Sequence, residues 1–213
     1  MAELEGVIKY QLNHIDKPIA CEPNIIAQLC VWRTLLVKLD LLGQDPNRYG
    51  GLGFGNISHR AGTDNEFLIT GTQTGHLHQL TQQNYCLVNT VDLKLNSIYS
   101  QGPCQPSSEA LTHASIYQNQ QACQCVIHVH NPKIWQYSQQ LGLAQTSTDT
   151  PYGTPEMANA VADLFTSGTF KNAALFTMAG HQDGVVAFGV TLEQAGQLLI
   201  KFLVRALLIN QQN

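Results

Sequence analysis

The chain has 213 residues, of which 44% are hydrophobic and 12% are charged, and its formal net charge is -4. This length allows one large domain or two small ones, and the apolar fraction is enough for a sizeable core. The charged fraction is about half the usual ~25%, so Gln, Asn, Ser and Thr must form much of the polar surface. A weakly acidic balance argues against a nucleic-acid-binding surface and against a polybasic membrane patch.

The sequence shows no sign of a membrane span or of export. No apolar run is as long as a bilayer span, and residues 1–9 contain Glu3 and Glu5 where a signal peptide would be apolar. The six cysteines form no Cys-x-x-Cys pair, which is typical of reduced, buried thiols in a cytoplasmic protein. Without a linker, a repeat or a charge block, residues 1–213 are predicted to form a single domain.

The first predicted helix covers residues 23–42. Pro23 suits the first helical position, apolar residues recur at steps of three and four, and Gly43 is expected to end the helix. The glycine-rich segment 48–55 is predicted to be a loop where the backbone approaches another group closely. Three short strands are predicted to follow, at residues 66–70, 85–91 and 96–100.

The second half of the chain alternates helices and strands. A helix is predicted from the serine pair before Glu109 to about residue 119, with a serine N-cap. Thr154 and Pro155 are expected to begin a further helix, and Thr191 with Gln194 indicates a capping box. The other predicted elements are strands at 123–129, 172–178 and 185–190 and a helix at 191–209. This order predicts an α/β protein in which helices cover the faces of one sheet.

His128 and His130 lie at the end of the predicted strand 123–129. Alternate residues of a strand point to the same face, so the two imidazoles can converge on one ion. Neutral imidazoles suit Zn²⁺ or a similar divalent first-row metal. The pattern is short, however, and two histidines placed at a strand end for other reasons are equally compatible with it.

A catalytic zinc usually has three protein ligands and one open position, so a third ligand must come from another part of the chain. His181 lies in a predicted turn at 179–184, which can project a side chain from the edge of a sheet, although a turn histidine is more often simply exposed. His76 and His78, in a loop rich in Gly and Thr, are weaker candidates. His113, one helical turn after Glu109, is compatible with a hydrogen bond near the site or with packing.

Several motifs occur in one order that resembles the class II aldolase/adducin family. They are Gly-Asn-Ile-Ser at 55–58, Leu-Ile-Thr-Gly-Thr-Gln-Thr-Gly at 68–75, Pro-Ser-Ser-Glu at 106–109, His-Val-His at 128–130, Tyr-Gly-Thr at 152–154 and Gly-His at 180–181. The resemblance covers roughly residues 25–207. It implies a three-layer α/β/α sandwich with a central, mainly antiparallel sheet, and a homotetramer with active sites between neighbouring subunits.

The resemblance also implies roles for individual residues. It implies a Zn²⁺ ion held by His128, His130 and His181, and it makes Glu109 the proton-transfer group. The positions that match the family's substrate-phosphate ligands are Asn56, Thr74, Gly75, Ser107 and Ser108. The implied reaction is the retro-aldol cleavage of a ketose or ketose phosphate through a metal-stabilised enediolate, a carbon–carbon lyase reaction. On local grounds alone, a Glu in a first helical turn is usually just a favourable partner of the helix dipole.

The sequence departs from the family pattern at three places. The loop after Thr70 is two residues longer than usual, Gln182 follows His181 where the family commonly has Gly, and the tail contains no tyrosine. The first departure leaves a non-phosphorylated substrate open, and the last requires another aromatic residue or another substrate. Candidate aromatic residues from a neighbouring subunit are Tyr117, Tyr137 and Tyr152. The sequence leaves open which aldehyde is released, the stereochemistry and the identity of the metal.

Two other functions are compatible with the same motifs. A sugar-phosphate dehydratase of the methylthioribulose-1-phosphate type also keeps a Glu and abstracts a proton beside a carbonyl, whereas the family's epimerases have Asp where Glu109 stands. A non-enzymatic, adducin-like module would lack the metal ligands, all of which are present here. An assay of the products separates lyase from dehydratase, and a metal analysis separates either enzyme from the module.

Overall fold

The computed structural model describes residues 6–62, 65–171 and 173–212. Within these ranges, nine strands form one sheet in the order β1-β7-β6-β5-β4-β8-β11-β10-β9. The strands of this sheet are β1 (Gln11–Ile15), β4 (Asn56–Arg60), β5 (Phe67–Thr70), β6 (Tyr85–Asp92), β7 (Ser97–Gln101), β8 (Cys125–His130), β9 (Ala144–Gln145), β10 (Leu175–Thr177) and β11 (Gly184–Gly189). Only the outermost pairs, β1 with β7 and β9 with β10, are parallel, so the sheet is mainly antiparallel.

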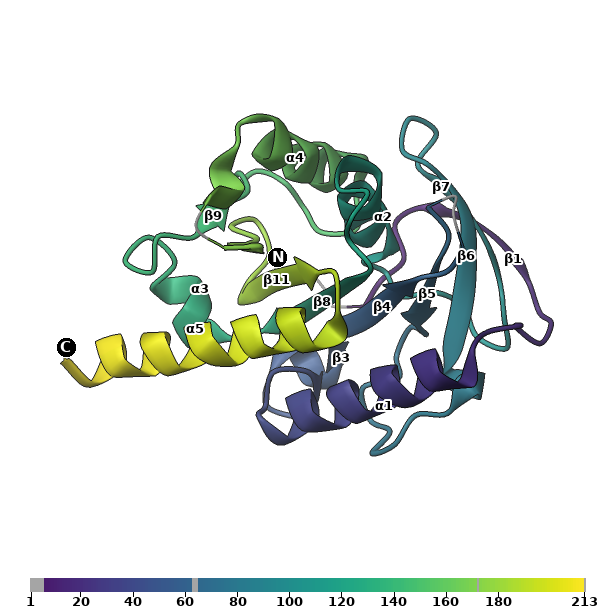
Figure 1. Ribbon diagram of the computed structural model, residues 1–213, viewed down its shortest axis with the longest axis horizontal. Helices are drawn as coiled ribbons and strands as arrows, with labels where there is room; N and C mark the ends of the chain where they lie inside the picture. The colour runs from purple at the N-terminus through teal and green to yellow at the C-terminus, as the bar shows by residue number, and fades with distance from the viewer. Residues whose placement is uncertain (1–5, 63–64, 172, 213) are drawn as a thin grey trace.

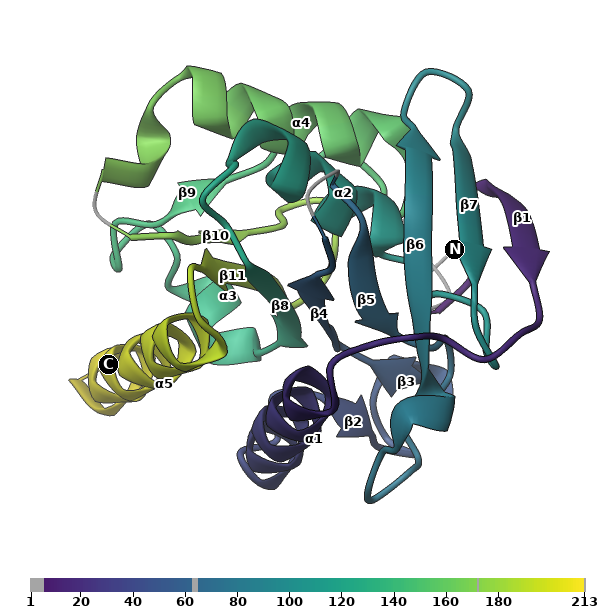
Figure 2. The same ribbon diagram turned by 45° about the vertical axis from the view of Figure 1, so that its right-hand side comes forward.

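Helices cover both faces of this sheet. The helices are α1 (Pro23–Lys38), α2 (Ala110–Asn119), α3 (Pro132–Gln136), α4 (Pro155–Thr166) and α5 (Leu192–Gln212), with short 3₁₀ turns at Tyr49–Gly51, Gln82–Asn84 and Thr169–Lys171. Figures 1 and 2 show α1 and α5 on one side of the sheet and α2 and α4 on the other. A small hairpin of β2 (Gly43–Gln44) and β3 (Gly53–Phe54) follows α1. The predicted three-layer α/β/α sandwich is therefore confirmed.

Each face of the sheet has its own hydrophobic core. Under α1 and α5, the side chains of Ile127 and Val129 join a cluster that includes Leu36 and Leu199. Under α2 and α4, the cluster includes Val126. Because successive side chains of a strand alternate between faces, His128 and His130 share the face of Val126 and point toward the layer of α2 and α4.

The strand β8 lies near the middle of the sheet, between β4 and β11. Asn56 on β4 and Val186 on β11 are both opposite His128, and Gly184 is opposite His130. All six residues of β8 are buried. The antiparallel pairing therefore brings the start of β4 and the start of β11 to the end of β8 that carries the two histidines.

Some expected element boundaries are wrong. Helix α1 ends at Lys38 rather than at residue 42, because Leu41 and Leu42 turn inward and are buried. The N-cap of α2 is Glu109 itself and not a serine, and it makes no side-chain capping bond. The predicted strand at 172–178 is shorter, at Leu175–Thr177, and its first predicted position lies outside the described residues.

Of two other expectations at helix ends, the first is confirmed and the second is met in part. Thr154 is the N-cap of α4, where its side chain accepts a hydrogen bond from the Met157 amide. Thr191 accepts a hydrogen bond from the Gln194 amide, while the Gln194 side chain accepts one from the Val190 amide rather than from Thr191 as in a strict capping box.

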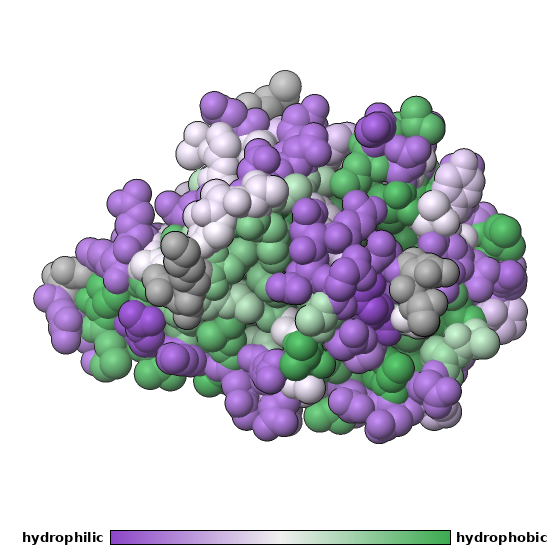
Figure 3. Space-filling model, turned by 45° about the horizontal axis from the view of Figure 1, so that its top comes forward, coloured by the Kyte–Doolittle hydropathy of each residue, from purple (hydrophilic) through white to green (hydrophobic). Residues whose placement is uncertain are grey.

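Hydrophilic side chains cover much of the face shown in Figure 3, interrupted by apolar patches. None of the helices in the described part of the chain has the length and apolarity needed to cross a bilayer. The signal-peptide region considered above begins with residues 1–5, which lie outside the described residues.

Candidate metal and anion site

Three histidines from two parts of the chain meet at the end of β8. The Nε2 atoms of His130 and His128 are 3.2 Å apart, and the Nε2 atoms of His181 and His130 are 3.1 Å apart. Their side chains form a set of potential ligands that lie within 4.8 Å of one another. The structure thus brings the turn histidine to the strand pair, an arrangement that the local sequence left open.

The spacing of these nitrogens fits a metal ion. Zinc–imidazole bonds are about 2.0–2.1 Å long, so two ligand nitrogens on a tetrahedral ion lie about 3.3 Å apart. The two Nε2–Nε2 distances of 3.1 and 3.2 Å are close to this value. Three neutral nitrogen donors that leave further positions open match a catalytic rather than a structural metal site. The three histidines could therefore hold a divalent metal.

Burial keeps these imidazoles neutral. It lowers the pKa of His128 to about 4, an effect that a hydrogen bond with the backbone of Val185 partly offsets. Burial first, and the neighbouring histidines second, lower the pKa values of His130 and His181 well below the ordinary value for histidine. Because a metal binds the deprotonated imidazole, this desolvation favours coordination at neutral pH.

A tight turn places His181. The His181 amide donates to the Met178 carbonyl at 3.0 Å, and the Gly184 amide donates to the His181 carbonyl at 3.0 Å. Asp183 has a positive φ of 63°. A Cβ at Gly184 would lie 2.7 Å from Cδ2 of the His181 ring, so only glycine leaves room for the ring in this orientation. The backbone hydrogen bonds of the turn and the absence of a side chain at Gly184 thus determine where the His181 ring lies.

Two aromatic rings that sequence reasoning did not assign to the metal site pack on its histidines. The Tyr152 ring lies 4.7 Å from the His181 ring, and the Tyr49 ring lies 4.7 Å from the His130 ring. The Tyr49 hydroxyl also donates to Asp183 Oδ2 at 2.8 Å. Tyr152 belongs to the Tyr-Gly-Thr motif of the family resemblance and is a candidate for a residue contributed by a neighbouring subunit, and Tyr49 falls in a predicted loop. Neither ring contact has a local sequence signal.

A polar pocket adjoins the histidines. Its lining contains all the predicted phosphate ligands together with Glu109 and His128, namely Asn56, Thr74, Gly75, Ser107, Ser108, Glu109 and His128, as well as Gly6, Gly53–Gly55 and Gly71–Gln73. The cavity volume is about 30 Å³. Residues from widely separated parts of the sequence are therefore brought to one pocket beside the possible metal ligands.

Glu109 is held at the start of α2 and is 3% exposed. The Thr112 hydroxyl donates to Glu109 Oε2 at 2.6 Å, and the Glu109 amide donates to Ser107 Oγ at 3.4 Å. The hydrogen bond from Thr112 restrains the orientation of this carboxyl group. This arrangement differs from the solvent-exposed helix-dipole partner that the local sequence alone would suggest.

The other predicted phosphate ligands are also constrained. Asn56 is 6% exposed, and its Oδ1 atom has no hydrogen-bond partner among the described residues. A buried amide oxygen normally has a partner, so a substrate group or a water is expected there. The Thr74 hydroxyl donates to the Gly71 carbonyl at 2.9 Å, which closes the loop on itself. Gly75 packs against the backbone of Gly43 and Gly53, where a Cβ would not fit.

The remaining candidate histidines lie elsewhere. His76 and His78 are exposed and do not join the cluster, so the structure does not support them as ligands. His113 is buried, and its Nδ1 atom is 2.7 Å from Ser58 Oγ. Of the candidate tyrosines, Tyr117 also forms a hydrogen bond with the Ser58 hydroxyl, and the Tyr137 hydroxyl donates a hydrogen bond to Asn210 Oδ1.

The segment Gly6–Tyr10 lies against this site. The Val7 amide donates to the Tyr152 hydroxyl at 3.1 Å, and Lys9 Nζ donates to the Tyr152 carbonyl at 3.0 Å and lies 3.6 Å from the centre of the Tyr152 ring. The Tyr10 hydroxyl donates to the Ser107 carbonyl at 2.9 Å. These contacts attach the N-terminal segment to both the His181 side and the Ser107 side of the site.

The depressed histidine pKa values predict acid sensitivity of the metal-free protein. At pH values between 6.5 and about 4, His128 is protonated in the unfolded chain but not in the folded one, so the free energy of unfolding falls as the pH falls through this window. Within this window, each such histidine changes the free energy of unfolding by about 1.4 kcal/mol per pH unit. Urea unfolding between pH 7.5 and 4.5 with a chelator present measures this slope.

The variant His128→Asn should flatten that dependence, and exposed His76→Asn serves as the control. An unchanged slope in His128→Asn would contradict the assignment of the acid sensitivity to this cluster.

Comparisons with known proteins agree with this architecture. Residues 46–206 match the family described as Class II Aldolase and Adducin N-terminal domain. An L-fuculose-1-phosphate aldolase from Thermus thermophilus has a similar structure, with a TM-score of 0.64 and 18% identity over 90% of this chain and 95% of that one. The structure of a sugar-phosphate aldolase from Thermotoga maritima has a TM-score of 0.67 and 15% identity, over 88% of this chain and 94% of that one. No curated protein sequence matches significantly.

A large sheet covered by helices on both faces is the fold that this chain shares with these class II aldolase structures. Since the family match covers more than half of the chain, the protein belongs to the class II aldolase and adducin N-terminal domain family. A third similar structure, an L-fuculose 1-phosphate aldolase from Glaciozyma antarctica PI12, has a TM-score of 0.59 and 16% identity over 92% of this chain and 78% of that one. At these identities the structural likeness establishes the fold alone.

Proposed function

We propose that the protein is a zinc-dependent lyase that cleaves a carbon–carbon bond of a ketose or ketose phosphate by a retro-aldol reaction. The observation that carries this proposal is the convergence of three histidine Nε2 atoms beside the pocket that Glu109 lines. A divalent metal bound there would act as a Lewis acid toward the negative charge that develops on the substrate's carbonyl oxygen. Three imidazole ligands suit zinc, and another first-row metal is compatible with them.

The chain's own residues supply the rest of the proposed chemistry. Glu109 is the group that takes a proton from the substrate hydroxyl and returns one to carbon, because it is a buried carboxylate at the pocket wall. The hydrogen bond from Thr112 keeps that carboxylate in one orientation. Asn56, Thr74, Gly75, Ser107 and Ser108 are proposed to hold an anionic group of the substrate, most simply a phosphate. The amides at the start of α2 favour negative charge there.

A screen of ketose phosphates and free ketoses with metal-loaded protein tests the proposed reaction. The expected products are two carbonyl fragments, one of them a dihydroxyacetone or its phosphate. A single product that has lost water would instead assign the sugar-phosphate dehydratase reaction, which the retained Glu109 also supports. Purified protein that contains no stoichiometric metal, and that acquires none when it is offered zinc, would favour a non-enzymatic module.

We also propose that the chain assembles into a homotetramer with active sites near subunit boundaries. Support comes from exposed apolar side chains on the outer helices: Val31 on α1 and Val204, Leu207 and Leu208 on α5 are each between 45% and 68% exposed. Light scattering combined with size-exclusion chromatography measures the assembly, and a monomeric mass at micromolar concentration would overturn this proposal.

A further inference from the structure

We propose that Arg33 on α1 is the positioning residue that makes the loop at 74–78 an anion-binding site, and that its positive charge selects substrates with an anionic group. This inference rests on the proposed function, in which Thr74 and Gly75 hold that group. Arg33 is not among the residues that line the pocket, so it acts through the loop and not by direct contact.

Arg33 is a buried charged residue. It is 2% exposed and shares the buried face of α1 with Leu29 and Leu36. No carboxylate among the described residues forms an ion pair with it, and all its hydrogen bonds go to backbone carbonyls. Because a buried charge is costly unless it is compensated, an anion close by would stabilise this guanidinium.

The guanidinium holds four carbonyls of one loop. Its NH2 nitrogen donates to the carbonyls of Thr74 at 3.2 Å and Gly75 at 3.1 Å. Its NH1 nitrogen donates to the carbonyls of Leu77 and His78. The fork of Arg thus fixes the orientation of several successive peptide groups, which a single ammonium group could not do.

This orientation determines where the loop's amides point. In a trans peptide the carbonyl and the following N–H point in opposite directions, and the described residues contain no cis peptide. With the Thr74 and Gly75 carbonyls turned toward Arg33, the N–H groups of Gly75 and His76 point away from it. The Gly75 nitrogen lies toward Gly53, which also lines the pocket. Such aligned N–H groups form an anion-binding concavity.

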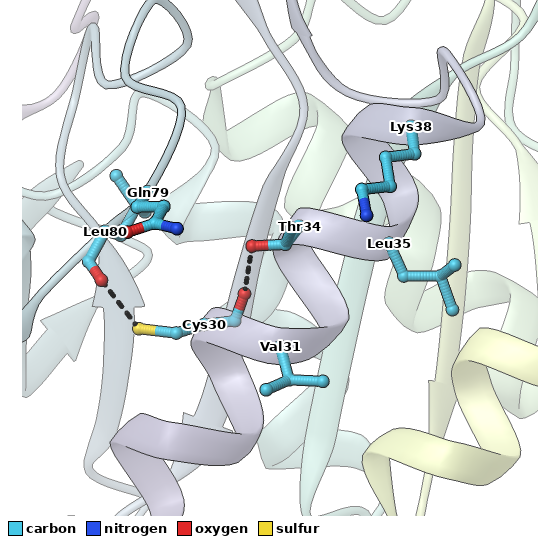
Figure 4. Close-up of a pocket in the computed structure, with 7 residues that line it drawn as sticks. All are labelled: Cys30, Val31, Thr34, Leu35, Lys38, Gln79 and Leu80. Atoms are coloured by element: carbon cyan, nitrogen blue, oxygen red, sulfur yellow. Dashed lines mark hydrogen bonds between the residues drawn. The ribbon is translucent and has the colours of Figure 1, made fainter.

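Helix α1 also contacts the end of this loop through a second residue, Cys30. Figure 4 shows Cys30, one helical turn before Arg33, with its thiol directed at the Leu80 carbonyl, and the distance between these atoms is 3.1 Å. Val31, Leu35 and Lys38 line the same surface pocket as Cys30 and Leu80. The loop is therefore fixed to α1 from Thr74 to Leu80, and the anion site is preorganised before a ligand arrives.

The test compares Arg33→Met and Arg33→Lys with Arg205→Met, which removes the same charge from an exposed position on α5. Inorganic phosphate is the probe, and calorimetry measures its affinity for metal-loaded protein. At an effective dielectric constant of ~20, losing the charge is expected to weaken anion binding by on the order of 10- to 100-fold. Arg33→Met should show this loss, Arg33→Lys a smaller one, and Arg205→Met none.

Kinetics give a second readout. For a ketose phosphate, Arg33→Met should raise KM by a similar factor with kcat changed less than threefold, while KM for a free ketose and the metal content stay unchanged. The inference would be overturned if Arg33→Met bound phosphate as tightly as the unmodified protein. It would also be overturned if the unmodified protein bound no phosphate, or if KM changed equally for both substrates. If Arg33→Met does not fold, Arg33→Lys decides between these outcomes. Phosphate binding without lyase activity would refute the proposed function while leaving the role of Arg33 standing.

Discussion

Replacement of Glu109 by glutamine is expected to lower kcat by roughly 10²- to 10⁴-fold, which is the usual contribution of a general acid–base group. Glutamine has almost the same shape and can still accept the hydrogen bond that Thr112 donates to Oε2 of the native carboxylate, so the pocket should keep its form. Only the ability to take and return a proton is lost. Steady-state kinetics on the substrate found in the screen, with metal content measured on the same sample, checks this result.

The matched control is Glu156→Gln, which removes a carboxylate from the first turn of α4 at an exposed position. It should leave kcat unchanged and lower stability by less than about 1 kcal/mol, the value of a helix-dipole contact. If Glu109→Gln behaved in the same way, Glu109 would be only a favourable residue at a helix start, and the proton would have to be carried by another group.

Loss of one histidine ligand should abolish tight metal binding. In His181→Asn the two strand histidines remain, but two imidazoles do not complete a catalytic site of three protein ligands. Metal at 1,000 times its Kd stabilises the folded protein by about 4 kcal/mol, and this increment should be absent from the variant. Thermal unfolding with zinc and with a chelator measures the difference, together with bound zinc per chain.

His76→Asn, at an exposed position outside the cluster, should keep the zinc-dependent rise in Tm. An equal rise in His181→Asn would show that the metal binds elsewhere. A chelator that left the Tm of the unmodified protein unchanged, in a sample shown to contain zinc, would also contradict a site formed by all three histidines.

Features that depend on a local sequence pattern, such as side-chain alternation along a strand or a helix start signal, could be predicted from the sequence. The alternation along β8 correctly placed His128 and His130 on one face with Val129 on the other. Thr154 before Pro155 correctly predicted the start of α4. The end of α1 could not be predicted in this way, because Asp40 adopts a positive φ of 56° and the following leucines are buried by contacts with distant strands.

The assembly of the site depends on long-range pairing, which local patterns do not encode. His181 reaches the strand histidines because Gly184 pairs with His130 across β11 and β8, and only the family resemblance indicated it in advance. Arg33 interrupts an apolar helical stripe and has no sequence signal that links it to Thr74. That residues 1–213 form one domain, and that the protein is cytoplasmic, stay predictions.

The contacts of Gly6–Tyr10 have a practical consequence for how the protein is produced. Val7 and Lys9 contact Tyr152, whose ring packs on His181, so a tag or fusion partner placed close ahead of Val7 would lie near the three histidines. Figure 1 shows that α5 carries the other end of the chain away from the sheet. Activity measured with a handle close ahead of Val7 should therefore be compared with that of protein from which the handle has been cleaved.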